Sequence, residues 1–265
     1  MKKYLIVNAD DFGLNKEVNN GIIDSFINGC VTSASLMTTE EGFEDAVEKI
    51  KQNSSLDIGI HLNITSGKVK KKLLLLFLKR ILFKEKLKKE IYDEFDNQIK
   101  RAIDNGIRIS HLDTDKHLHI FPFILKILID LSKKYKIETI RFPFEKRVDL
   151  IKINPRQLLK IFFSYIFRKQ CVGLFNKHHI YHPDFFYGIS LSTRFSVQNF
   201  MKTIDDLDFG VSEISCHPAY NMVESGSFIT GKNRDDERKV LTNSKISCYI
   251  KEKEIILTNF KKLKY

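Results

Sequence analysis

The fold is decided by the stretch Lys3-Tyr4-Leu5-Ile6-Val7-Asn8-Ala9-Asp10-Asp11-Phe12-Gly13. Residues 5–7 form a short apolar run rich in β-branched side chains, which predicts a strand buried in a parallel sheet. The run leads into two adjacent carboxylates, Asp10 and Asp11. Because ligands of α/β proteins bind at the carboxyl ends of strands, we expect chemistry here. Taken alone, an aspartate in this position is more typical of a helix N-cap, so the rest of the chain must decide.

Strand and helix patterns alternate along the whole chain. Runs typical of strands cover residues 5–7, 30–37, 56–64, 107–112, 139–142 and 211–216, with a closing strand at 254–260; helical spacing covers 15–28, 43–52, 86–105, 124–134 and 235–249. This alternation predicts an α/β fold, a distorted TIM-like (β/α) barrel with its site at the carboxyl ends of the strands. With no Gly/Ser/Pro-rich linker and no internal repeat, residues 1–265 are predicted to be a single domain.

Cysteine usage and hydropathy predict the compartment. The four cysteines are far apart and show no Cys-x-x-Cys spacing, which favours buried thiols in a reducing compartment over disulfides or a zinc knuckle. An acidic pair inside the first strand argues against a signal peptide. No uncharged apolar run approaches the roughly 20 residues that span a bilayer. We therefore expect a cytoplasmic protein, either free or peripheral at the inner face of the membrane.

Two segments carry the formal net charge of +11. Residues 68–90 contain ten Lys/Arg and two Glu, and residues 151–177 contain six Lys/Arg and no acid. Both segments interleave these charges with Leu, Ile and Phe. Ordinary helices with solvated lysines explain the pattern, and so does a patch that binds an anionic membrane surface. Nucleic acid is disfavoured, because no helix-turn-helix, zinc-finger or RNP pattern is present. A homodimer is left open.

Acids and imidazoles follow four of the predicted strands. They are Asp10 and Asp11, then His61, then the group Asp113, Asp115, His117 and His119, and finally His217. Each has an ordinary explanation by itself: a hydrogen-bonded core histidine, a solvated turn or the start of a loop. Their joint occurrence at one face of the fold instead predicts a mixed carboxylate–imidazole site for one divalent cation. Such a cation would also relieve the repulsion between adjacent carboxylates.

Four motifs, in order along the chain, match a known family. They are Asn8-Ala9-Asp10-Asp11-Phe12-Gly13, Gly59-Ile60-His61-Leu62-Asn63, the run from His111-Leu112-Asp113 to His119-Ile120-Phe121-Pro122, and Glu213-Ile214-Ser215-Cys216-His217-Pro218. Together they resemble the YdjC-like carbohydrate deacetylases, which include chitooligosaccharide and hopanoid-associated deacetylases. The resemblance implies a barrel-like fold, a divalent metal and hydrolysis of the N-acetyl group of an acetylated amino sugar.

The resemblance also implies roles for individual residues. Asp11 and His61 correspond to metal ligands, and Asp10 corresponds to the general base. The third ligand of the family is a histidine at the position that Asp115 occupies here. Since a second carboxylate makes the site harder, we expect Mg²⁺ to be favoured, with Mn²⁺ and Zn²⁺ as alternatives. His117 or His119 could instead supply the missing imidazole.

The expected reaction is metal-assisted amide hydrolysis. Asp10 would take a proton from the attacking water, and His217 would protonate the departing amine, which leaves poorly without a proton. His117, His119, Arg141 and Asp184 are candidates for binding sugar hydroxyls, although each could equally serve as a structural ion pair or hydrogen bond. Two alternatives remain open: a metal-dependent phosphoesterase that uses the same site, and an inactive glycan- or membrane-binding protein.

Overall fold

The computed structural model describes residues 2–64, 84–145, 155–192, 195–220 and 231–263. Its centre is a curled parallel sheet in the order β4-β3-β2-β1-β6-β5, with β7 pairing to β1. The strands are β1 (Lys3–Phe12), β2 (Ser33–Leu36), β3 (Asp57–Leu62), β4 (Ile109–Thr114), β5 (Phe185–Tyr187), β6 (Gly210–Cys216) and β7 (Ile256–Leu257). The predicted parallel α/β architecture is therefore confirmed.

The segment from Thr139 to Glu145 closes the open side of the sheet only loosely. Isolated parallel bridges join Leu112 to Ile140, Thr139 to Tyr181 and Glu145 to Phe186. We predicted a regular strand over 139–142, and that prediction is wrong. Pro143 follows directly, and proline has no N–H to give to a ladder. The result is a distorted barrel with an irregular seam between β4 and β5.

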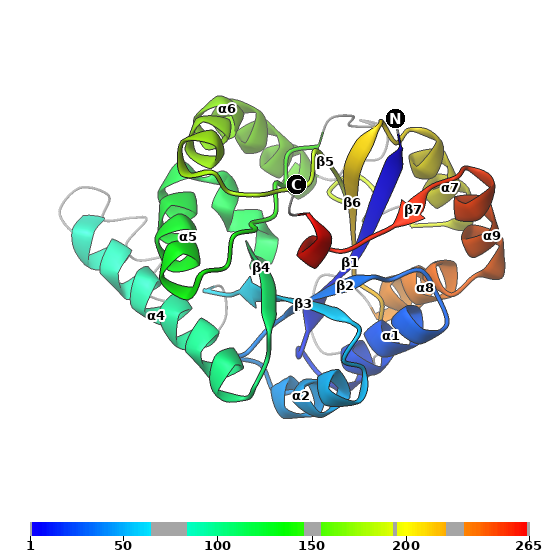
Figure 1. Ribbon diagram of the computed structural model, residues 1–265, viewed down its shortest axis with the longest axis horizontal. Coiled ribbons are helices and arrows are strands. Elements are labelled where there is room, and N and C mark those ends of the chain that lie inside the picture. Colours follow the sequence, from blue (N-terminus) through cyan, green and yellow to red (C-terminus); the bar gives the residue numbers. More distant parts are fainter. Residues whose placement is uncertain (1, 65–83, 146–154, 193–194, 221–230, 264–265) are drawn as a thin grey trace.

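Helices surround the sheet (Figure 1). They are α1 (Lys16–Ile27), α2 (Phe43–Gln52), α4 (Lys84–Asp104), α5 (Pro122–Tyr135), α6 (Pro155–His178), α7 (Val197–Asp205), α8 (Gly231–Leu241) and α9 (Ser244–Glu252), with 3₁₀ segments η1 (Asp115–Ile120) and η2 (Phe260–Lys262). The single helix predicted over 235–249 is in fact two helices. The chain breaks at Asn243, whose side chain caps α9 by accepting a hydrogen bond from the Lys245 backbone N–H.

The end of β1 settles the first ambiguity of the sequence. The N-cap of α1 is Asn15, whose side chain accepts a hydrogen bond from the Val18 N–H at 2.9 Å. Asp10 and Asp11 are still part of the strand. The N-cap explanation of the aspartates is thus excluded, and their carboxylates need another partner.

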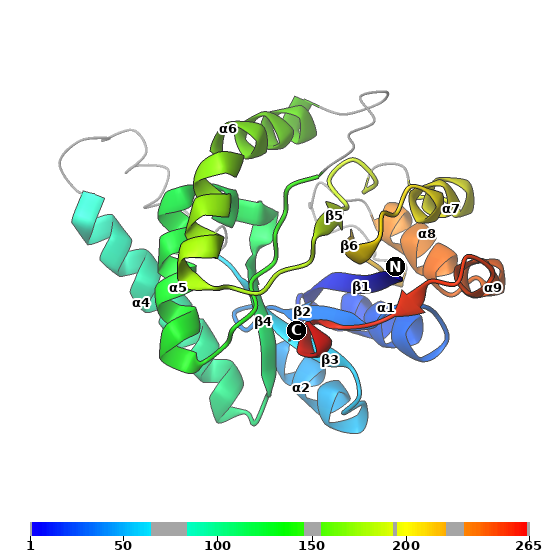
Figure 2. The ribbon, with the colours of Figure 1, turned by 45° about the horizontal axis from the view of Figure 1, so that its top comes forward.

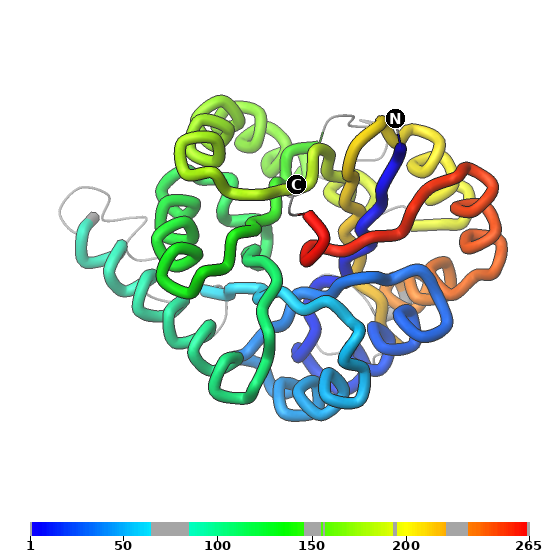
Figure 3. The backbone as a smooth tube through the Cα atoms, in the orientation of Figure 1, coloured from blue at the N-terminus to red at the C-terminus, as the bar shows by residue number. Residues whose placement is uncertain are grey.

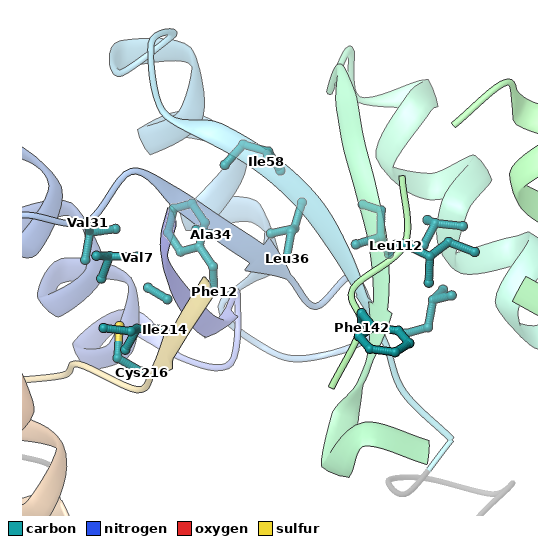
Figure 4. Close-up of a cluster of buried hydrophobic side chains, with 14 of the residues drawn as sticks. Val7, Phe12, Val31, Ala34, Leu36, Ile58, Leu112, Phe142, Ile214 and Cys216 are labelled. Atoms are coloured by element: carbon teal, nitrogen blue, oxygen red, sulfur yellow. The ribbon is translucent and has the colours of Figure 1, made fainter. Parts of the chain in front are cut away.

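Apolar side chains pack between the sheet and the helices. Figure 4 shows part of this core, where Val7, Ala34 and Ile214 from three adjacent strands lie near one another. The first and last strands of the chain also lie side by side. In Figure 3 the C-terminal segment returns beside β1, where Tyr4 pairs with Ile256 of β7. Buried parallel strands of this kind need apolar side chains on both faces, which makes the polar residues among them conspicuous.

The basic segments are described in part. Residues 68–83 and 151–154 lie outside the described residues, whereas 84–90 belong to α4 and 155–177 to α6. Figure 2 shows α6 beside α5 at the periphery of the molecule. Among the helices of the described ranges, none is long and apolar enough to cross a membrane.

Candidate active site and metal centre

An irregular backbone brings both aspartates of β1 into one site. Adjacent side chains of a regular strand point to opposite faces. Here the register against β2 shifts between Ala9 and Phe12, and Asp11 adopts a left-handed backbone with φ of +68°. Aspartate tolerates this conformation better than bulkier residues do, and such irregularities are frequent at functional sites. Gly13 completes the turn, because a Cβ there would lie 2.4 Å from the Met37 carbonyl oxygen.

Arg141 lies at the centre of a fully buried ionic network. Its guanidinium donates two hydrogen bonds to Asp10, at 2.6 and 2.9 Å, and lies 2.7 Å from Asp113 and 2.7 Å from Glu213. Although burial opposes ionisation, Arg141 and the neighbouring histidines hold the pKa of Asp10 well below its usual value. Burial raises the pKa of Glu213 to about 8, reinforced by the charges of Asp10 and Asp113. Glu213 is therefore protonated at neutral pH.

His61, from β3, joins this network to Asp11. Its Nδ1 lies 2.8 Å from Asp113 Oδ1, and its Nε2 lies 3.5 Å from Asp11 Oδ1. A carboxylate on one ring nitrogen is the arrangement that orients a metal-binding histidine through its other nitrogen. Burial alone would lower the pKa of His61, but Asp113, Asp10 and Asp11 raise it to about 10.

Two groups of side chains have the spacing of a cation site. Asp11, His61 and Asp115 each bring one ligand atom within 4.8 Å of the others, as do Asp10, His61 and Asp113. In the second group Arg141 already neutralises both carboxylates. In the first, Arg234 and Lys116 each engage one oxygen of Asp11 and Asp115 respectively, and the other oxygen of Asp11 faces His61, whose raised pKa favours a proton on its ring. The donor set therefore fits a divalent cation that would take the place of that proton.

His217, at the end of β6, faces Asp10 from the other side. Its Nε2 lies 3.9 Å from Asp10 Oδ2, and its backbone N–H donates to Glu237 of α8. Its Nδ1 lies 3.8 Å from the same Glu237 carboxylate. Burial opposes the imidazolium, but Glu237, Asp10 and Asp11 raise the pKa of His217 above its usual value. The arrangement places the His217 imidazole opposite the Asp10 carboxylate.

Arg234, also from α8, contacts Asp11 directly. Its Nη2 donates to Asp11 Oδ2, which leaves Oδ1 on the side of His61. Only 3% of Arg234 is exposed, and within the described chain its Nη1 has no hydrogen-bond partner. A buried guanidinium with an unused donor can bind an oxygen of a ligand.

The remaining predicted residues differ in their position. His117 is buried in η1 beside Phe186, with its Nδ1 unpaired among the described residues. His119 has both ring nitrogens engaged, by Thr114 Oγ1 at 2.7 Å and the Arg141 carbonyl oxygen at 3.2 Å. Burial lowers the pKa of both imidazoles.

Asp184 is not brought to this cluster. Its carboxylate accepts from the Val211 N–H at 2.8 Å, at the amino end of β6, whereas His217 follows the carboxyl end of the same strand. Arg141 reaches the cluster, but its hydrogen bonds go to carboxylates rather than toward solvent. Of the residues predicted for sugar binding, Asp184 thus holds the start of a strand and Arg141 holds the ionic network.

Four residues of the site were not predicted from the sequence. Glu213 was detectable, because a lone acid in the apolar strand Gly210–Cys216 requires a buried partner. Arg234 and Glu237 are three residues apart on one face of α8, a spacing too common among surface helices to be noticed. Lys160 of α6 was counted only as one charge of a basic segment. Asp115, Asp10 and Asp11 raise its pKa, but burial outweighs them and lowers it.

Comparison with known proteins agrees with this geometry. The family model of YdjC-like proteins matches residues 4–252. Two curated relatives, both called carbohydrate deacetylase, come from Brevibacillus brevis and Clostridium beijerinckii. The first is 34% identical over 98% of this chain and 99% of its own length, and the second is 32% identical over 97% and 98%. The protein is thus an α/β protein with an acidic, imidazole-containing site at its strand ends, and it belongs to the YdjC-like family, as its motifs predicted.

Solved structures confirm the fold. A protein of Enterococcus faecalis, provisionally named a cellobiose-phosphate cleavage protein, superposes with a TM-score of 0.76 at 23% identity over 99% of both chains. A peptidoglycan N-acetylglucosamine deacetylase superposes with a TM-score of 0.53 at 11% identity, over 99% of this chain and 88% of that one. At these identities the likeness concerns the arrangement of strands and helices.

Proposed function

We propose that this protein is a carbohydrate deacetylase that hydrolyses the N-acetyl group of an acetylated amino sugar with the help of a divalent metal. The observation that carries the proposal is that two sets of side chains lie next to each other. They are the Asp11–His61–Asp115 donor set and the Asp10–His217 pair. Hydrolysis of an amide needs a base for water and an acid for the amine. The names of the relatives supply the class of substrate.

Asp11, His61 and Asp115 would hold the metal. A bound divalent cation makes water a better acid and stabilises negative charge on an attacked carbonyl oxygen. Asp113 orients His61, and Arg234 holds the second oxygen of Asp11, so both ligands are positioned before a cation arrives. With two carboxylates and one imidazole, we propose Mg²⁺ as the favoured ion over Mn²⁺ and Zn²⁺.

Asp10 and His217 would move the protons. Because Arg141 keeps Asp10 ionised, the carboxylate would be available to accept a proton from the attacking water. Burial opposes the imidazolium of His217, but Glu237 raises the pKa of this group, and His217 would give a proton to the amine as the carbon–nitrogen bond breaks. We propose that Arg234 Nη1 and His117, whose polar atoms are buried and unpaired among the described residues, contact oxygens of the sugar or its acetyl group.

The test is acetate release from diacetylchitobiose and from a lipid-linked N-acetylglucosamine, with metal-loaded and EDTA-stripped protein. We expect release that EDTA abolishes, that Mg²⁺ restores best, and that Asp11→Asn lacks. The Asp115→His variant should move the preference toward Zn²⁺, since imidazole suits zinc better than magnesium. Phosphate release from a sugar phosphate in place of acetate would establish the phosphoesterase alternative. Neither product, together with no metal binding, would mean a binding protein without activity.

A further inference from the structure

The outer face of α6 is apolar where a soluble helix is normally polar. Five large side chains, Leu158, Leu159, Phe162, Tyr165 and Ile166, are between 49% and 83% exposed. With 3.6 residues per turn, these positions fall on one face over the first half of the helix. Single exposed apolar residues need no explanation, but a contiguous group of this size marks an interaction surface.

Every Asp, Glu, Lys or Arg position along α6 itself is basic. The whole of α6 contains no Asp or Glu. Lys169 lies on the same face, one turn beyond Tyr165 and Ile166, and Arg168 and Lys177 are exposed farther along. A surface that is apolar in one half and basic in the other matches the interface of an anionic lipid layer, where acyl chains lie beneath phosphates.

The inner face of the same helix packs against the site. Phe163 and Phe167 contact Phe121, with ring centroids 5.5 and 5.6 Å apart, directly after η1. Cys171 Sγ lies 3.3 Å from the carbonyl oxygen of Ile120, the last residue of η1. Lys160, half-buried on this inner face, interacts electrostatically with Asp115. The helix that bears the apolar face is therefore also a wall of the site.

We propose that α6 docks on an anionic membrane surface, with its apolar face in the headgroup layer and its basic side chains on lipid phosphates. The docked protein would meet an acetylated amino sugar carried on a lipid, and this second statement rests on the proposed deacetylase function. A second copy of the chain fits the face less well. Two α6 helices brought together would oppose like charges with no acid on either of them.

Vesicle flotation tests the docking without any substrate. We expect the wild type to float with phosphatidylcholine vesicles that contain phosphatidylglycerol, to bind pure phosphatidylcholine weakly, and to dissociate as salt is added. Phe162→Ser/Ile166→Ser and, separately, Lys169→Glu should each weaken partitioning by about tenfold or more. The matched control is Ile27→Ser, whose side chain is 60% exposed at the end of α1, and it should bind as the wild type does.

Three outcomes would overturn the docking. The wild type could fail to float with anionic vesicles, the Phe162→Ser/Ile166→Ser variant could float as the wild type does, or light scattering could show a dimer that this double substitution dissociates while vesicle binding is unchanged. Acetate release then separates the two proposals. The α6 variants should keep the wild-type rate on soluble diacetylchitobiose and lose about tenfold on lipid-linked N-acetylglucosamine in anionic vesicles. Flotation without acetate release from any substrate would leave the docking intact and refute the deacetylase.

Discussion

The centre of the site and the outer face of α6 distribute polarity in opposite ways. Around Arg141 the protein buries a guanidinium and three carboxyl groups almost completely. Along α6 it exposes Phe162 and Tyr165 to solvent beside lysine and arginine. Both arrangements cost stability in an isolated protein, since buried charge loses hydration and exposed apolar surface gains nothing from folding. In both proposals, the positions that cost stability are those where the chain would meet a ligand.

The largest effect is expected from a substitution of His217, the residue proposed to protonate the departing amine. His217→Gln keeps a polar side chain of similar size but removes the proton donor. We expect kcat for acetate release to fall about 10²–10⁴-fold with the thermal unfolding midpoint nearly unchanged. His178→Gln, at the exposed end of α6, is the control and should have no effect. A rate close to that of the wild type would remove His217 from the mechanism.

The second-largest effect is expected from removing the buried positive charge of Arg141. Arg141→Met leaves three carboxyl groups buried without their cation, and we expect the free energy of unfolding to fall by about 3–5 kcal/mol. The control is Arg101→Met, which removes an exposed ion pair with Glu44 and should change the same quantity by less than about 1 kcal/mol. Urea unfolding measures both, and equal effects would mean that burial of the network contributes nothing.

The pH dependence of stability sharpens the description of the interior. Burial raises the pKa of Glu213 in the folded protein to about 8, from its ordinary value of 4.5. Its contribution to stability is therefore present below pH 4.5 and is lost as pH rises through 8. Glu213→Gln cannot titrate, so the unfolding free energy of the wild type relative to this variant should decrease across that window. A constant difference from acid to alkaline pH would show that folding does not shift the pKa of Glu213.

The smallest effect is expected on the outer face. Phe162→Ala should change the free energy of unfolding by no more than about 0.5 kcal/mol, because the side chain is 57% exposed. Phe175→Ala, on the buried face of the same helix, should cost about 3–5 kcal/mol. Chemical denaturation of the pair compares two phenylalanines of one helix. A large loss for Phe162→Ala would mean that the face is covered within the protein.

Periodicity and motif order were sufficient for the fold class, because a parallel strand and the helix after it are written into consecutive residues. The apolar run of β1, the spacing of α2 and the polar strand ends all fall where the sequence predicted them. The failures occurred where a single residue within or next to a segment interrupts its periodic pattern. Asn243 breaks one helical pattern with a cap, and Pro143 limits one strand to isolated bridges.

For the site, the sequence by itself determined which chemical groups are available: the aspartate pair, His61, Asp115 and His217. Tertiary structure alone decided which partner each group has. Arg141 is 131 residues from Asp10 along the chain, and Arg234 is 223 residues from Asp11. pKa values and ligand availability depend on charges within a few ångströms in space. No local pattern could therefore predict the raised pKa of Glu213, or the contacts of Arg234 with Asp11 and of Glu237 with His217. Likewise, the composition of α6 was visible in the sequence, but only packing against η1 decided which of its faces remained exposed.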